Sequence, residues 1–114
     1  MRKIIDYISI ALILLLGLLH TSMTPVFYKA FNISALWFAG TGLAFVFLGV
    51  INIARVKTSE ILIKQLCFTV NVIAVVYCVF VVIKLAKPHA YFSLIVLLFL
   101  LILSFIDLTV SKND

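Results

Sequence analysis

The chemistry open to this chain rests on a few polar side chains that interrupt long apolar runs. Asp6, Lys64 and Asp107 each lie near one end of such a run, at a similar depth. Because an unpaired charge inside lipid is costly, we expect Lys64 to pair with one of the two aspartates. Glu60 is a rival partner, since it lies one helical turn before Lys64. The group would form either an entry site for protons or ions, or a purely structural ion pair.

His20 and His89 lie at the opposite ends of the apolar runs. Histidine titrates near neutral pH, so the pair would suit proton relay or metal binding. Zinc usually takes four ligands, however, and no carboxylate lies at that end of the runs. Haem would need two histidines facing each other deep inside the protein, whereas these two lie at its rim. We therefore expect neither a metal nor another cofactor.

The end of the runs that holds the histidines is purely basic, whereas all four acidic residues lie toward the other end. Its basic residues are His20, Lys29, Lys84, Lys87 and His89. This outer basic rim would receive an anionic ligand, a lipid phosphate or a quinone-like carbonyl. The alternative is that these side chains simply reach lipid headgroups.

Asn71 is the strongest single candidate for a functional polar group in the middle of an apolar run. It lies about ten residues into its run, roughly 15 Å along a helix and so near the middle of a bilayer. An amide there needs hydrogen-bond partners, and we expect Thr41 or Ser9 to supply them. The alternative role is to join helices, which buried asparagines do in membranes.

Neither the two cysteines nor any familiar catalytic motif supports an enzymatic function. Cys67 and Cys78 are too far apart along one helix for a disulfide, so we interpret both as packing residues. The chain has no Gly-rich phosphate loop, no His-Glu-x-x-His and no Gly-x-Ser-x-Gly. An enzyme acting on lipids or quinones is the least favoured alternative.

The elements that position these residues are predicted by composition. Of 114 residues, 66% are hydrophobic and 11% are charged, which a soluble domain of this size could not bury. Four apolar runs each have the length of a membrane-spanning helix. We predict an all-α membrane protein, a four-helix antiparallel bundle forming a single transmembrane domain over residues 1–114, with spans at about 4–21, 32–54, 61–86 and 89–110.

The first run would alternatively be a signal peptide, but no small-x-small cleavage site follows it, so we expect it to be retained. The net charge of +5 does not indicate a nucleic-acid partner, because the basic residues punctuate apolar runs instead of forming a patch. We expect membrane lipids as partners instead.

Orientation follows from the basic residues, which are more numerous on the side that holds both termini. That side carries Arg2, Lys3, Arg55, Lys57, Lys64 and Lys112, against Lys29, Lys84 and Lys87 on the other. The positive-inside rule therefore places the N- and C-termini in the cytoplasm. The outer loop at 23–31 is aromatic and apolar, and we predict a re-entrant or interfacial flap on the outer surface, with a substrate lid as the alternative.

Helical periodicity predicts which faces pack inside the bundle. Polar side chains share one face in three of the four spans, and these are Asp6, Ser9 and His20 in the first, Lys64, Cys67, Asn71 and Cys78 in the third, and His89, Ser93, Ser104 and Asp107 in the fourth. The second span has a seam of small residues instead, Ala35, Ala39, Gly42 and Gly49. Small residues let membrane helices approach closely.

The segments at 20–28, 36–44 and 48–52 resemble a group of uncharacterised small bacterial four-span membrane proteins. The resemblance covers the first half of the chain and implies a location in the bacterial inner membrane, with no activity to transfer. Length and span count also invite comparison with small multidrug resistance transporters. Those proteins carry a glutamate in the middle of the first span, where this chain has no acid.

Two functional hypotheses follow. The favoured one is a small binding or accessory subunit, assembled as a homo-oligomer or with a larger membrane partner, because the seam suits close packing and no charge lies at the midplane. The alternative is a small oligomeric transporter or channel for protons or a small hydrophobic or anionic solute. Its pathway would use Asp6, His20, Lys64, Asn71, His89 and Asp107.

Overall fold

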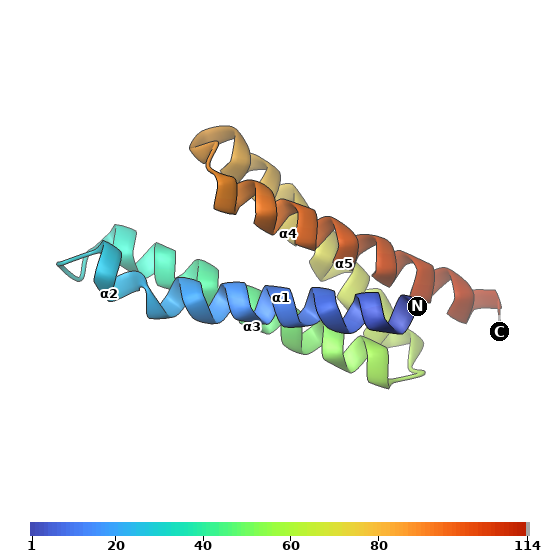
Figure 1. Ribbon diagram of the computed structural model, residues 1–114. Helices are drawn as coiled ribbons and strands as arrows, with labels where there is room; N and C mark the ends of the chain where they lie inside the picture. The colour runs from blue at the N-terminus through green and yellow to red at the C-terminus, as the bar shows by residue number, and fades with distance from the viewer. Residues whose placement is uncertain (114) are drawn as a thin grey trace.

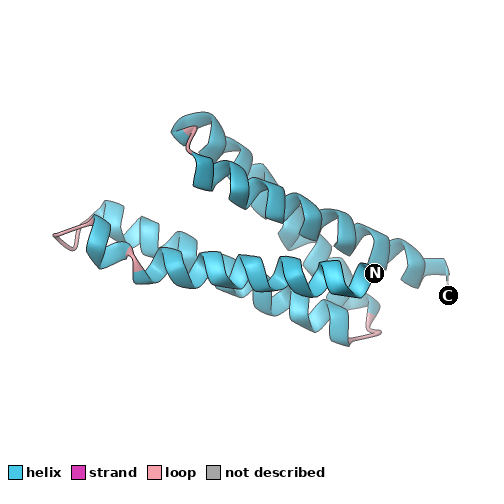
Figure 2. Cartoon of the chain, in the orientation of Figure 1, coloured by secondary structure: helices cyan, strands magenta, loops and turns pink. Residues whose placement is uncertain are grey.

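The computed structural model describes residues 1–113 and is helical almost throughout, with short connections (Figure 2). Asp114, one of the four acidic residues, lies outside the described residues. The helices are α1 (Arg2–Ser22), α2 (Thr24–Phe27), α3 (Ile33–Lys57), α4 (Ile61–Leu85) and α5 (Pro88–Asn113). Four of them, α1, α3, α4 and α5, are long and apolar enough to cross a membrane.

The long helices form an antiparallel bundle that measures 53 × 24 × 24 Å. Both termini and the α3–α4 connection lie at one end, at the right of Figure 1. The segment around α2 and the α4–α5 turn lie toward the other end, which we call the outer end. A helix of 25 residues is about 37 Å long at 1.5 Å per residue, enough to cross a hydrocarbon core of about 30 Å. The fold is therefore that of a multi-pass membrane protein.

Local chemistry sets the ends of several helices. Asn32 caps α3, because its Oδ1 accepts a hydrogen bond from the Ala35 backbone N–H at 2.8 Å. Helix α4 ends at Leu85 and is followed by Ala86, which has a left-handed backbone (φ 48°). Pro88 then begins α5, where its missing N–H and fixed φ are tolerated. The reversal between α4 and α5 therefore needs only Ala86 and Lys87.

The bundle is built from two hairpins. Helix α1 packs along α3, and α4 packs along α5, while α1 and α5 provide most of the contact between the hairpins. In Figure 1 the hairpins lie closest near the termini and diverge toward their outer tips. Groups that join α1, α3, α4 and α5 near the termini therefore hold the two hairpins together.

The glycines of the α1–α3 hairpin lie where the backbones come closest. A Cβ atom at Gly17 would lie 2.6 Å from the Gly42 carbonyl oxygen. A Cβ at Gly42 would lie 2.7 Å from the Gly17 carbonyl oxygen, and one at Gly49 would meet the Leu14 side chain. The seam predicted in the second span therefore packs against α1, with Ala35 also buried and Ala39 half-buried.

An apolar core fills the bundle between its two ends. Ile13, Leu97 and Leu100 have exposed fractions of 0–1%. Ile10, Phe45, Leu48, Cys78 and Val96 complete the cluster. Close packing of this kind leaves little room for water. Outward-facing positions are also largely apolar, as a bilayer requires.

Candidate functional site

A buried arginine is the centre of the most polar region of the protein. Helix α3 continues to Lys57, three residues past the predicted span, so Arg55 lies inside the helix and is 1% exposed. Its Nη1 donates to Asp107 Oδ2 on α5, and its Nη2 donates to Asp6 Oδ1 on α1. One guanidinium therefore joins three helices and both hairpins.

Arg2 adds a second cation at the edge of this group. Its Nη2 lies 3.2 Å from Asp107 Oδ1, and its side chain is 45% exposed. Both carboxylate oxygens of Asp107 are thus bound by arginines, one buried and one near the surface. Charge-assisted hydrogen bonds of this kind are stronger than neutral ones. The ion cluster, defined here as Arg2, Asp6, Arg55 and Asp107, carries no net charge.

Two asparagines extend the ion cluster toward the middle of the bundle. Arg55 Nε donates to Asn52 Oδ1 at 3.2 Å. Asn52 Nδ2 donates to Asn71 Oδ1 at 3.0 Å, and Asn71 Nδ2 lies 3.2 Å from Asn52 Oδ1, so the two amides bond reciprocally. Asn71 Nδ2 also lies 3.1 Å from Ser104 Oγ. All of these amide and hydroxyl groups are fully buried.

The ion cluster together with Asn52, Asn71 and Ser104 forms one hydrogen-bonded network, which we call the network. Its buried polar atoms all have hydrogen-bond partners within the described part of the chain. Across residues 1–113, every buried side-chain nitrogen and oxygen has a hydrogen-bond partner. A buried charge is stable only when it is paired and its other donors and acceptors are also used. The arrangement therefore holds three charges inside the bundle without an orphaned group.

No family model, curated protein or solved structure matches this chain. The role of the network is therefore inferred from its own contacts.

The predicted pairing of Lys64 with an aspartate is wrong. Lys64 Nζ donates to Ser111 Oγ at 2.6 Å, and Arg55 takes both aspartates instead. Among the ion pairs of residues 1–113 neither Lys64 nor Glu60 appears. Arginine suits two carboxylates better than lysine, because its planar fork presents several donors in fixed directions.

The partners predicted for Asn71 are also wrong. Asn71 bonds to Asn52 and Ser104, and its Nδ2 lies near Cys67 Sγ and the Leu100 carbonyl oxygen. Thr41 donates to a carbonyl of its own helix and is not involved. The inward face predicted for α4 is otherwise correct, since Cys67 and Cys78 are both buried.

Sequence reasoning missed Arg55 and Asn52, the two residues of α3 at the centre of the network. The predicted second span ends at residue 54, which leaves Arg55 outside the helix and among the topology signals. Two signals pointed to it. Asn52 and Arg55 are three residues apart and so share a helix face. Two aspartates in the first and fourth spans also required a cation at their own depth.

The residues of the outer basic rim do not form one site. The α2 segment, which precedes Lys29, and the α4–α5 turn, which contains Lys87, lie at separate tips of the two hairpins (Figure 1). The His20 and His89 rings are nearer, with centroids 6.5 Å apart. His20 stacks on Phe38 with centroids 3.9 Å apart. Within residues 1–113 no group of three or more His, Cys, Asp or Glu side chains could hold a metal ion.

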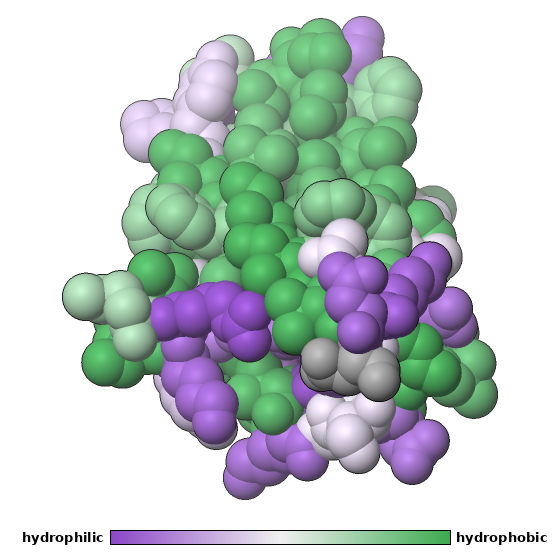
Figure 3. All heavy atoms as spheres, turned by 90° about the vertical axis from the view of Figure 1, so that its right-hand side faces the viewer, coloured by the Kyte–Doolittle hydropathy of each residue, from purple (hydrophilic) through white to green (hydrophobic). Residues whose placement is uncertain are grey.

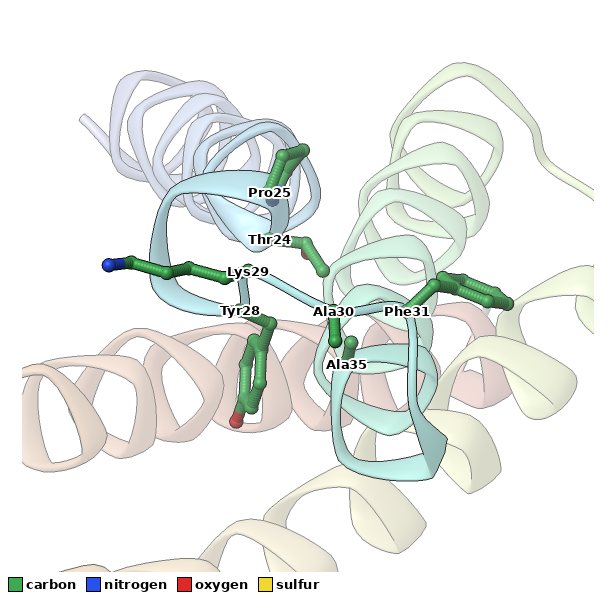
Figure 4. Close-up of a pocket in the computed structure, with 7 residues that line it drawn as sticks. All are labelled: Thr24, Pro25, Tyr28, Lys29, Ala30, Phe31 and Ala35. Atoms are coloured by element: carbon green, nitrogen blue, oxygen red, sulfur yellow. The ribbon is translucent and has the colours of Figure 1, made fainter.

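A cavity of about 250 Å³ lies at the outer loop, where the flap was predicted. The loop contains the short helix α2 followed by extended chain. In Figure 4 the Lys29 and Phe31 side chains extend in opposite directions, away from one another. Phe31 is 85% exposed. The polar groups around this cavity do not converge on a common point, so it resembles an interfacial surface more than a reaction site.

The two polar regions are separated by the apolar core. The ion cluster and the asparagines lie toward the termini, whereas His20 and His89 lie at the outer end. Between them are Ile13, Leu97 and the other core side chains. Hydrophilic side chains accordingly gather at the end that holds the termini, in the lower part of Figure 3. The network can hold helices together and stabilise buried charges at the end that holds the termini. Its hydrogen bonds do not extend to the outer end.

Proposed function

We propose that the protein is a small binding or accessory subunit of the bacterial inner membrane, with both termini in the cytoplasm. The observation that carries this proposal is the apolar core that separates the network from the outer histidines. A conduit needs a wet or polar path from one side to the other. The buried network instead occupies one end and uses its donors and acceptors internally.

The location and orientation are supported by the basic residues and by the resemblance of the first half of the chain. With Arg55 set aside as a buried partner of two aspartates, five basic residues remain at the end that holds the termini and three at the outer end. This excess has the direction that the positive-inside rule requires.

The accessory role includes assembly with a second copy or with a larger membrane protein. Gly42 and Gly49 are used inside the α1–α3 hairpin, so this contact would use another face. Gly40 lies on the exposed side of α3 with nothing within 4 Å of the position of a Cβ. This face leaves room for a neighbouring helix.

The test is the reactivity of the two native cysteines toward a membrane-impermeant maleimide, in intact and in opened vesicles. Cys67 is 0% exposed and Cys78 is 3% exposed, so we expect neither to react until the protein is denatured in SDS. The Lys57→Cys and Lys29→Cys variants are matched controls, because each places a thiol near one end of the bundle. Both controls should react in opened vesicles.

Rapid labelling of Cys67 or Cys78 in the folded protein would overturn the proposal and favour the transporter alternative. Proton flux in liposomes provides a second measurement. Flux above protein-free liposomes that is lost in Asn71→Leu would establish a path through the network. Flux at the protein-free level would agree with a closed core.

A further inference from the structure

A second cavity, of about 110 Å³, lies beside the ion cluster at the end of the bundle that holds the termini. Its walls come from the first turn of α1, the last turn of α3, the first turn of α4 and the last part of α5. The lining residues are Arg2, Lys3, Asp6, Arg55, Val56, Thr58, Lys64 and Asp107. Hydrophilic residues gather at this end of the protein, between hydrophobic ones, in the lower part of Figure 3.

The lining of this cavity has an excess of positive charge. Four cationic side chains and two carboxylates line it, which leaves two positive charges without a carboxylate partner. The carboxylates are already engaged, Asp6 by Arg55 and Asp107 by both arginines. Glu60, the only other acidic residue in the described chain, does not line the cavity. A cation would be repelled here, whereas an anion would find uncompensated charge.

Two lysines supply that charge. Lys64 donates to the neutral Ser111 hydroxyl at 2.6 Å, which uses one of its three N–H groups and leaves its charge uncompensated. Lys3 is exposed and takes part in none of the ion pairs among residues 1–113. Thr58 Oγ1 accepts from the Glu60 backbone N–H at 3.1 Å, so its own hydrogen is available to an acceptor.

We propose that this cavity binds a phosphate group through Lys3, Lys64 and Arg2. Phosphate offers several acceptor oxygens, which suit clustered lysine and arginine donors. The source of the group is either the headgroup of an anionic phospholipid or free phosphate. The cavity lies at the ends of the helices, near the expected level of the lipid headgroups. Both a lipid headgroup and free phosphate would therefore have access to it. The proposal does not rest on the accessory role, since a conduit would accommodate the same site.

The test is calorimetric titration of the purified protein in an uncharged detergent with three probes, which are dihexanoyl phosphatidylglycerol, dihexanoyl phosphatidylcholine and inorganic phosphate. We expect phosphatidylglycerol to bind with a stoichiometry of one. The double variant Lys3→Gln/Lys64→Gln should bind it about tenfold more weakly, a change of about 1.4 kcal/mol. The matched control Lys84→Gln/Lys87→Gln removes the same charge at the outer end and should change the affinity less than about twofold.

The probes separate the two sources of phosphate. Competition by inorganic phosphate would assign a site that also takes the free anion. Phosphatidylglycerol binding that inorganic phosphate does not displace would assign the lipid headgroup. Three results would overturn the proposal: no binding of stoichiometry one, equal binding of phosphatidylcholine, or equal losses in the two double variants. If Lys3→Gln/Lys64→Gln loses its helical circular dichroism, the Lys3→Gln variant replaces it, with a loss of about threefold expected.

Discussion

At the residue scale, the Arg55 guanidinium bonds to carboxylates on α1 and α5 and to an amide on its own helix. Removing water from a charge costs several kcal/mol, and a pair repays this only when its geometry is good and its other donors are used. Each of the three nitrogen atoms of the Arg55 guanidinium donates a hydrogen bond. The same feature makes it vulnerable, because each partner is buried and depends on it.

Replacement of Arg55 by leucine should therefore lower the free energy of unfolding by about 3–5 kcal/mol, because it leaves Asp6 and Asp107 buried without their shared cation. SDS-driven unfolding followed by circular dichroism measures this change. Lys57→Leu, which alters an exposed cation on the same helix, is the control and should cost less than about 0.5 kcal/mol.

The triple variant Arg55→Leu/Asp6→Asn/Asp107→Asn should recover most of the lost stability, because no uncompensated buried charge remains. A triple variant as unstable as Arg55→Leu alone would show that the contribution of Arg55 is packing and not charge pairing.

The reciprocal amides of Asn52 and Asn71 should behave as one unit. Asn71→Leu removes both bonds to Asn52 and the contact with Ser104, so we expect a loss of about 1–2 kcal/mol. Because Asn52→Leu breaks the same bonds, the double variant should cost at least about 0.5 kcal/mol less than the sum of the single variants. The control is Thr69→Val, on an exposed part of α4. Strict additivity in SDS unfolding would contradict the reciprocal pair.

At the scale of elements, the α1–α3 hairpin depends on glycines at the crossing of the two backbones. Gly17→Ala and Gly42→Ala should each lower the free energy of unfolding by about 1–3 kcal/mol, because the new methyl group would lie within 3 Å of a backbone carbonyl. Gly40→Ala is the matched control, since its Cβ would meet open space. It should leave the free energy of unfolding unchanged or raise it by up to about 1 kcal/mol, because alanine favours a helix more than glycine does. Equal changes in all three variants would contradict the close approach of α1 and α3 at Gly17 and Gly42.

Sequence patterns predicted the four helices and most of the inward faces, because apolar length and the 3.6-residue period are local properties. Asp6, Ser9, Asn71, Ser104 and Asp107 are all buried as their spacing indicated. The pairing of charges depended on how the two hairpins dock, which is not a local property. Lys64 and Arg55 lie at similar depths, and only the three-dimensional arrangement shows which one faces the aspartates.

The residue at which the second span is predicted to end decides whether Arg55 is recognised as a buried residue. Ending the span at residue 54 placed Arg55 in a loop and turned a central side chain into a topology signal. Helix α3 continues to Lys57, so Arg55 keeps the helical direction of Asn52 and reaches the interior. Helix ends are the least certain part of any sequence-based assignment.

At the scale of the whole molecule, the four long helices place both termini on the same side. We predict that this side is cytoplasmic. In a chain whose native cysteines are replaced by serine, Lys112→Cys should react with an impermeant maleimide only after the cells are opened. Lys29→Cys should react in intact cells. Labelling of both positions from the same side would contradict the antiparallel arrangement, and a reversed pattern would contradict the cytoplasmic termini.

The ion cluster also has a consequence for how the protein is made. Asp6 and Arg55 both belong to the first hairpin, so during synthesis the Arg55 charge meets a carboxylate as soon as α3 packs on α1. Asp107 is synthesised last and finds its cation only on a hairpin that is already in place. Integration of the final helix is therefore coupled to completion of the first two. A chain with a defective first hairpin would expose an unpaired acid to lipid and to quality-control proteases.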